Sequence, residues 1–235
     1  MSMKFRLNPA YKELQSTSDK TMSAGETVRM FTEKSESANL DILDEATRID
    51  NGRLDIPVYF STCGPDAFSL TGTRKQMGKG ATPELAEASA VMELAERFSI
   101  YSFLGNPDNF ITDTYANLGD RAVDFQHIAR SVHDEDSAFY VESRQIFSDI
   151  EFRWAKAYNL TKGEEVLVPV DWFFMINEFN GTSAGNCSEE AICQGACELV
   201  ERHVCDLVSK KMPPLPRIEP ASAQSGETCE LIRKF

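Results

Sequence analysis

The first third of the chain alternates hydrophobic and polar positions in a way that predicts β-strands. Residues 41–49 (DILDEATRI) and 56–62 (IPVYFST) have the two-residue period of strands with one buried face. A turn is expected at 64–66, and 67–74 (AFSLTGTR) then returns as another strand, which predicts a β-hairpin. A short helix is expected upstream of these strands, at 26–34.

Two later segments have the longer period of amphipathic helices. The first, residues 83–104, follows Thr82, whose hydroxyl is a good helix cap. The second, residues 188–212, begins with Ser188, which we expect to cap it. Both helices are long enough to cross a whole domain, and we expect their hydrophobic faces to pack on sheet.

The segments around these helices are less regular. Residues 152–160 and 165–174 are predicted to be two strands joined by a tight turn, whereas 106–137 has no clear period. The last residues, 226–235, have the pattern of a helix that has barely begun. We therefore expect the chain to be a fragment of a longer domain.

A short motif repeats on the two predicted helices. ELAER occupies 93–97 and ELVER occupies 198–202, an offset of 105 residues, and Gly80 matches Gly185 at the same offset. Self-similarity at a fixed offset indicates an internal structural duplication. The expected fold is α+β, with mostly antiparallel sheets, long helices on one face and a duplicated loop-helix unit. We place its copies at about 50–105 and 150–212.

On each predicted helix the glutamates share one face and the hydrophobic residues share the other. Glu93 and Glu96 lie together on the first helix, and Glu190, Glu198 and Glu201 lie together on the second. Two interpretations are open. Periodicity alone favours a solvated polar face, because every amphipathic helix has one. The alternative is that two acidic stripes, each ending in Arg and preceded by a glycine loop, bind Mg²⁺ and phosphate together.

Composition narrows the classes of function. Of the 235 residues, 24 are Lys or Arg and 37 are Asp or Glu, so the net charge is −13. This sign disfavours a general nucleic-acid binder, and we expect no nucleic-acid partner. No apolar run approaches the ~18 residues of a membrane span, and the first residues lack the apolar core of a signal peptide. We expect a cytoplasmic protein without a membrane partner.

Common catalytic motifs are absent from the sequence. The six cysteines form no CxxC pair, so we expect reduced and mostly buried thiols. The segment 72–79 resembles a phosphate-binding P-loop, but it has one residue too many between its glycines and lacks the final Ser or Thr. No GxGxxG motif occurs, and the three histidines lie in no serine-hydrolase context.

Two long segments resemble a known family. GKGATPELAEASAVMELAER, at 78–97, is similar to the GKG segment and the SxxxExxER motif of the YcaO superfamily. TSAGNCSEEAICQGACELVER, at 182–202, is similar to the SAGN segment and the ExxER motif of that superfamily. Its members are ATP-using enzymes that activate peptide amide bonds. The likeness covers about 20–212, and family members are considerably longer, so the whole of 1–235 is expected to be a C-terminally incomplete YcaO-like ATP-binding domain.

The resemblance implies a site for ATP and Mg²⁺ that uses no P-loop. The implied metal-binding residues are Glu93, Glu96, Glu190, Glu198 and Glu201. The implied nucleotide-binding residues are Lys20, Thr27, Lys79, Ser89, Arg97, Ser183, Asn186, Gln194 and Arg202. No catalytic residue beyond these binding groups is assigned.

The resemblance also implies a reaction. A nucleophile adds to a peptide carbonyl, ATP phosphorylates the resulting oxyanion, and loss of phosphate leaves an azoline or a thioamide. The expected partners are a peptide or protein substrate, a sulfur donor or partner protein, and a second copy in a homodimer. An alternative remains open, in which the chain is a non-catalytic accessory factor supporting β-methylthiolation of a ribosomal protein.

Overall fold

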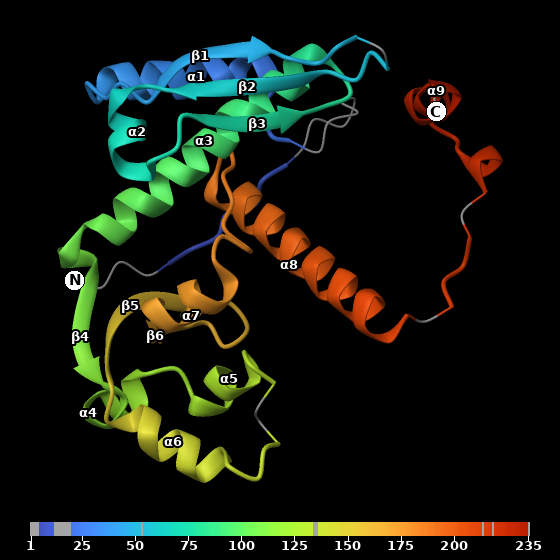
Figure 1. Ribbon diagram of the computed structural model, residues 1–235. Helices are drawn as coiled ribbons and strands as arrows, with labels where there is room; N and C mark the ends of the chain where they lie inside the picture. Colours follow the sequence, from blue (N-terminus) through green and yellow to red (C-terminus); the bar gives the residue numbers. More distant parts are fainter. Residues whose placement is uncertain are drawn as a thin grey trace. The chain divides into compact units, whose positions relative to one another are not determined.

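The chain divides into two compact units (Figure 1). Unit 1 comprises Met1–Arg6 and Phe103–Asn180, and unit 2 comprises Leu7–Ser102 and Gly181–Phe235. Within the described residues, no helix is both long and apolar enough to cross a membrane. The computed structural model describes residues 5–11, 20–52, 54–133, 136–212, 214–217 and 219–234.

Unit 2 is built on a three-stranded antiparallel sheet. Its strands lie in the order β1 (Leu43–Arg48), β2 (Val58–Cys63) and β3 (Lys75–Lys79). Helix α1 (Ala24–Ser37) precedes the sheet and α3 (Pro83–Gly105) follows it (Figure 1). The two strands predicted first and the helices predicted at 26–34 and 83–104 are therefore present.

Helix α3 lies directly on the sheet because small residues permit a close approach. The hydroxyl of Ser61 donates a hydrogen bond of 2.7 Å to the carbonyl oxygen of Ala90. A Cβ atom on Gly78 would overlap the backbone of Ala90, so only glycine fits there. Cys63, on the same face as Ser61, packs with Phe31 of α1 in a core around Leu94, Ile42 and Ala67. Helices α1 and α3 therefore cover one face of the sheet, as predicted.

The predicted hairpin is wrong in its second strand. Residues 65–71 form helix α2 (Pro65–Thr71), and the returning strand β3 begins only at Lys75. Proline fits the first turn of a helix, and Gly72 ends α2 in the left-handed conformation, at φ 67°. Ala67 and Thr71, four residues apart, are the buried positions of α2, so this short segment follows a helical period.

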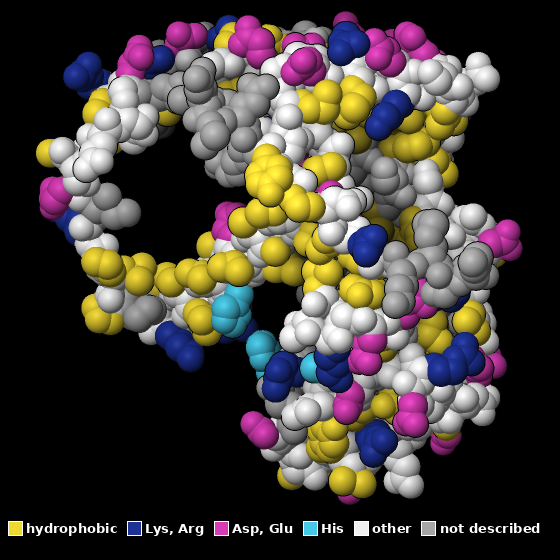
Figure 2. Space-filling view, turned by 180° about the vertical axis from the view of Figure 1, so that it is seen from behind, with side chains coloured by type: hydrophobic (Ala, Val, Ile, Leu, Met, Phe, Trp, Pro, Cys, Tyr) yellow, Lys and Arg dark blue, Asp and Glu magenta, His cyan; other side chains and the backbone are white. Residues whose placement is uncertain are grey.

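Helix α8 (Ser188–Lys211) is the second predicted long helix. Its cap is Cys187, which makes no side-chain capping bond, so the predicted Ser188 cap is wrong. The expected packing of its hydrophobic face on a sheet is also wrong, because Leu199 and Val200 are 50% and 63% exposed. Figure 2 shows hydrophobic side chains at the surface along this helix. Cys193 and Cys197 of the same helix are exposed, contrary to the expectation of buried thiols. A 3₁₀ turn (Pro220–Ser222) and α9 (Gly226–Lys234) follow.

Unit 1 contains a second antiparallel sheet, in the order β4 (Phe110–Thr114), β5 (Glu151–Asn159) and β6 (Glu164–Pro169). Its core surrounds Trp154, which is fully buried and donates its indole N–H to the carbonyl of Asp113 at 2.9 Å. The helical elements of unit 1 are a 3₁₀ turn (Pro107–Asn109), α4 (Tyr115–Leu118), a 3₁₀ turn (Gly119–Arg121), α5 (Phe125–Arg130), α6 (Tyr140–Ser148) and α7 (Val170–Asn177).

The strand predicted at 165–174 is half correct. It ends at Pro169, which cannot donate a ladder hydrogen bond, and the apolar residues that follow form α7. Trp172 and Phe173 of α7 pack against the same aromatic core as Trp154. Each three-stranded sheet precedes a glycine-containing loop and a long helix in the sequence, which agrees with the predicted duplication.

Candidate functional site

A cavity of about 290 Å³ lies in unit 2 between the N-terminal segment, α3 and the start of α8. Eight of the predicted site residues line it, from three segments far apart in the sequence. The polar lining combines carboxylates, amides, hydroxyls and one ammonium group, and methionine, leucine and alanine side chains form the remaining wall. The predicted residues that line the cavity are Lys20, Thr27, Ser89, Glu93, Glu96, Asn186, Glu190 and Gln194.

The N-terminal segment is held in the site by contacts with the loop before α8. Helix α1 begins with a capping box between Ser23 and Glu26, which fixes its first turn. One turn into the helix, buried Thr27 donates its hydroxyl to the side-chain carbonyl of Asn186 at 2.9 Å. The capping box thus orients the first turn of α1 so that Thr27 reaches the loop.

Glu190, in the first turn of α8, is the main anchor of this segment. Its carboxylate accepts hydrogen bonds from the amide of Thr21 at 3.1 Å and the hydroxyl of Thr21 at 2.8 Å. The Lys20 ammonium lies 3.7 Å away, and the Asn186 amide donates at 3.3 Å. Burial opposes its ionisation, but the donors from Thr21, Asn186 and Lys20 outweigh burial and hold the pKa of Glu190 below its ordinary value.

Glu93 and Glu96 approach the cavity from α3, together with Arg97. The guanidinium of Arg97 lies 2.7 Å from Glu93 and 3.2 Å from Glu96. Thr182, in the loop before α8, donates its hydroxyl to Glu96 at 2.6 Å. Burial raises the pKa of Glu96 above its ordinary value, and the charges of Glu93 and Glu198 add to this effect. The site therefore concentrates negative charge where a cation would relieve it.

The loop before α8 also fixes the second ELxER motif. The backbone amide of Gly181 donates to Glu198 at 3.1 Å, and Arg202 lies 3.4 Å from the same carboxylate. Ser183 Oγ donates to the carbonyl of Ala191, so this hydroxyl braces the loop against α8. Gly181, at φ 85°, has the left-handed conformation that glycine adopts readily.

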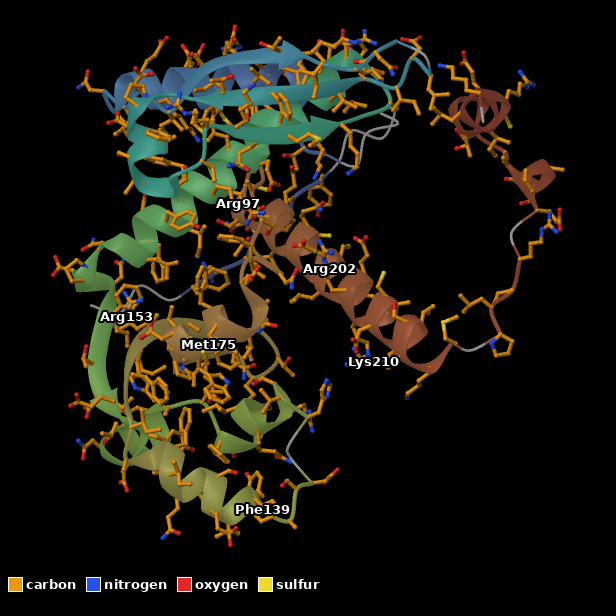
Figure 3. All side chains as sticks on the ribbon, viewed as in Figure 1. Arg97, Phe139, Arg153, Met175, Arg202 and Lys210 are labelled. Atoms are coloured by element: carbon orange, nitrogen blue, oxygen red, sulfur yellow. The ribbon has the colours of Figure 1, made fainter. Side chains whose placement is uncertain are left out.

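Six predicted residues do not line the cavity. Arg97 contacts two carboxylates that do, and Ser183 and Glu198 hold the adjoining loop. Lys79 is exposed on β3, and Glu201 is exposed on α8. Figure 3 shows Arg97 on α3 near the first turns of α8 and Arg202 farther along α8.

The donor set fits Mg²⁺ with a phosphate chain. Among the described residues, no three His, Cys, Asp or Glu side chains are grouped closely enough to hold a metal ion by themselves. Mg²⁺ typically binds only one or two protein carboxylates, and phosphate oxygens and water complete its coordination. Glu93, Glu96 and Glu190 in one cavity satisfy that requirement, and Lys20 in the same cavity would supply a cation for a phosphate oxygen.

Two site residues escaped the sequence analysis. Thr21 was not predicted because it follows Lys20 in a polar segment with no hydrophobic periodicity. Thr182 lies one residue before the predicted Ser183. Both act through hydroxyl donors to glutamates, at 2.8 Å and 2.6 Å. Thr21 and Thr182 are each adjacent to a predicted residue. The only sequence signal for them was the small, polar character of the segments in which they lie.

Comparison with known proteins identifies a matching family. A family profile described as "YcaO cyclodehydratase, ATP- and Mg²⁺-binding" matches residues 77–235. An uncharacterized protein of Methanothermobacter thermautotrophicus is 29% identical over 225 residues, covering 89% of this chain and 53% of that protein. An uncharacterized protein from the tfuA 3′ region of Rhizobium leguminosarum bv. trifolii is 30% identical, covering 72% of this chain and 40% of that protein.

Solved structures agree on the fold. A heterocyclase in complex with substrate and cofactor superposes with a TM-score of 0.68 at 21% identity, covering 98% of this chain and 34% of that one. A protein of Methanopyrus kandleri bound with AMPPCP and Mg²⁺ superposes with a TM-score of 0.62 at 24% identity, covering 93% of this chain and 53% of that one. The chain thus spans about half the length, or less, of these relatives.

Proposed function

Because the chain belongs to the YcaO family, which binds ATP and Mg²⁺, we propose that it activates a peptide backbone amide by phosphorylating the carbonyl oxygen. The product would be an azoline, when a neighbouring side chain attacks, or a thioamide, when a sulfur donor does. The substrate is a peptide or protein, and a partner protein supplies sulfur in the thioamide case.

The main support for the proposal is that carboxylates from both ELxER helices line one cavity. Glu93 and Glu96 from the first ELxER helix face the same cavity as Glu190 from the second. A solvated polar face, the competing interpretation of these stripes, would not bring carboxylates from two helices together around the amides and hydroxyls that line one cavity. The raised pKa of Glu96, caused mainly by burial, supports the same view, because a bound cation would favour its ionised form.

Different residues of the cavity would bind Mg²⁺ and the nucleotide. Glu93 and Glu96 would hold Mg²⁺, and Lys20 would bind a phosphate oxygen. The amides of Asn186 and Gln194 line the same cavity and would orient the nucleotide by hydrogen bonds. Arg97 forms ion pairs with both Glu93 and Glu96, which restrains the positions of the two carboxylates.

Dehydration to an azoline consumes only ATP and the peptide, whereas formation of a thioamide also consumes a sulfur donor. When bound, ATP supplies the phosphoryl group that makes the amide oxygen a leaving group, and Mg²⁺ offsets the charge that develops. Attack by a neighbouring side chain loses one water overall, with its oxygen leaving in phosphate. Attack by a sulfur donor replaces that oxygen by sulfur. The protein contributes positioning and charge neutralisation, as in other phosphoryl transfers.

A binding experiment followed by a turnover experiment tests the proposal. We expect Mg²⁺ with ATP to raise the melting temperature of the chain by linkage, and neither component alone to do so fully. The chain and a version longer by roughly 150–200 residues, a domain-sized increment, should then be incubated with candidate peptides. Mass spectrometry should detect loss of one water or replacement of oxygen by sulfur with the longer version.

The control is Glu93→Gln, which removes one carboxylate from the cavity without changing its volume. It should abolish the melting shift while the circular dichroism spectrum stays unchanged. No melting shift with the unaltered chain or the longer version would contradict the site itself. Binding of Mg–ATP by both, without modification of any peptide, would instead favour the accessory role.

A further inference from the structure

The two carboxylate oxygens of Glu190 have different neighbours. Oε2 accepts hydrogen bonds from the backbone amide of Thr21 at 3.1 Å and from the hydroxyl of the same residue at 2.8 Å. The ammonium group of Lys20 lies instead near Oε1, at 3.7 Å, and the amide of Asn186 is 3.3 Å from each oxygen. Among the described residues, Glu190 is therefore held mainly by Oε2, and Oε1 is the oxygen with fewer hydrogen bonds.

Thr21 is placed to act on the cavity through Glu190. Its neighbours in the sequence, Lys20 and Met22, both line the cavity, whereas Thr21 is not one of the lining residues. Only 9% of the Glu190 side chain is exposed, so little water is available to replace a donor that is lost. A change at Thr21 should therefore alter the orientation of this carboxylate and leave the lining of the cavity in place.

The segment that contains Thr21 is attached at a second point. Thr27, six residues later, donates its hydroxyl to the side-chain carbonyl of Asn186 at 2.9 Å. The amide of Asn186 donates in turn to Glu190 at 3.3 Å. These four residues form a continuous series of hydrogen bonds between the N-terminal segment and the start of α8. The position of Thr21 is therefore restrained relative to the carboxylate that it binds.

An oriented carboxylate is more important for Mg²⁺ than for Ca²⁺. A glutamate side chain has several rotatable bonds, and ordering them costs conformational entropy. A carboxylate that is ordered before the metal binds does not subtract this cost from the affinity. Mg²⁺ demands nearly ideal octahedral geometry, whereas Ca²⁺ accepts about six to eight oxygen ligands in flexible geometry. A residue that orients one ligand should therefore contribute more to the binding of Mg²⁺.

We propose that Thr21 is a positioning residue for the metal, which holds Oε2 of Glu190 and leaves Oε1 to bind Mg²⁺. The inference rests on the proposed function, because it requires Glu190 to be a ligand of the metal that accompanies the nucleotide. Thr21 contacts neither the metal nor the nucleotide in this role. Its contribution is selectivity for Mg²⁺ over larger divalent cations at the same site.

Calorimetric titration of the chain with a non-hydrolysable ATP analogue, in Mg²⁺ and separately in Ca²⁺, tests the proposal. Thr21→Val keeps the shape of the side chain and removes the hydroxyl. It should raise the dissociation constant in Mg²⁺ about tenfold, since a hydrogen bond to a charged group contributes that much or more. In Ca²⁺ the rise should be less than about threefold, because this ion tolerates a displaced ligand. Thr21→Ser should restore the values of the unaltered chain.

The matched control is Thr32→Val, because the hydroxyl of Thr32 donates within α1, to the carbonyl of Val28. Both dissociation constants should stay unchanged in this variant. Amide hydrogen exchange then tests the contact without any nucleotide. The Thr21 amide should exchange faster in Glu190→Ala, which removes its acceptor, whereas the Thr27 amide, bonded to the carbonyl of Ser23, should stay protected.

The two measurements distinguish failure of this inference from failure of the proposed function. Equal losses of affinity in Mg²⁺ and Ca²⁺ on Thr21→Val would identify a structural tether and overturn the positioning role. Unchanged affinity in both ions, or unchanged exchange of the Thr21 amide in Glu190→Ala, would overturn it as well. Normal exchange in a chain that binds nucleotide in neither ion would instead contradict the proposed function, and the positioning role with it.

Discussion

The hydrogen bond from Thr182 to Glu96 makes the ionisation of this carboxylate open to a direct test. The hydroxyl lies 2.6 Å from the carboxylate and opposes the effect of burial, which raises the pKa of Glu96. A hydrogen bond to a charged group contributes about 1.5–3 kcal/mol. Thr182→Val keeps the shape of the side chain but removes the donor, so the pKa of Glu96 should rise further.

The consequence is a change in the pH dependence of Mg–ATP binding. Mg²⁺ requires the ionised carboxylate, so binding is lost as pH falls through the pKa of Glu96. The loss should begin at higher pH in Thr182→Val. At mildly acidic pH we expect its affinity to fall about tenfold or more, because ~1.4 kcal/mol corresponds to tenfold. At higher pH, where Glu96 is ionised in both proteins, the difference should disappear.

Titration calorimetry with a non-hydrolysable ATP analogue and Mg²⁺, at a series of pH values, measures this effect. Thr182→Ser is the control, because serine keeps the hydroxyl and loses only a methyl group. Its binding profile should follow that of the unaltered chain. Identical profiles for the valine and serine variants would show that the hydroxyl does not govern Glu96, and the reasoning would fail.

Other substitutions separate the cavity from its surroundings. Glu93→Gln should abolish the melting shift caused by Mg–ATP, whereas Glu201→Gln, outside the cavity, should retain it; equal loss in both would extend the metal site along α8. Gly78→Ala should destabilise the fold by about 3 kcal/mol, because a Cβ at this position overlaps the backbone of α3. Gly25→Ala is the control and should leave the stability unchanged, because a Cβ there meets no atom. The midpoints of denaturant unfolding measure both effects. A neighbouring guanidinium lowers the pKa of Asp50 from 3.8 to about 2. The ionised carboxylate therefore stabilises the fold above pH 3.8, and this stabilisation is lost as pH falls from 3.8 to about 2. Asp50→Asn should make the free energy of unfolding depend less on pH over that interval.

Long elements were predictable from the sequence, and short ones were not. The helices α3 and α8 begin and end within a residue or two of expectation, because many periodic positions contribute to each prediction. The seven residues of α2 contain too few positions to distinguish a period of two from one of 3.6. Helix α6 (Tyr140–Ser148) was missed because its buried face is supplied mainly by Phe147 and Tyr140, both in contact with distant aromatic residues.

The candidate site was predicted in its chemistry and only partly in its membership. Family motifs located the glutamates, and the structure brings Glu93, Glu96 and Glu190 to one cavity. Helical periodicity placed Glu201 on the same stripe as Glu190, but a stripe 24 residues long is far longer than a cavity. Which members of a stripe reach a site depends on which part of the helix approaches the rest of the unit. On α8 that close approach is at Gly195, where a Cβ would overlap the carbonyl oxygen of Gly181.

The cavity joins parts of the chain that are made at very different times during synthesis. Thr21 binds a carboxylate 169 residues later, and Thr27 binds an amide 159 residues later. At translation rates of about 5–20 residues per second, the N-terminal segment waits roughly ten to thirty seconds for these partners. The capping box of Ser23 and Glu26 is local, so α1 is able to start at once.

Folding of this chain should therefore proceed from local to distant contacts, with the cavity completed last. The sheet of β1, β2 and β3 pairs neighbouring segments and is available as soon as α3 has emerged. The contacts of Lys20, Thr21 and Thr27 then attach the N-terminal segment to the start of α8, at sequence separations of 159 residues or more. A nascent chain would have no nucleotide cavity until α8 is made, and ligand could add stability only after the rest of the fold has formed.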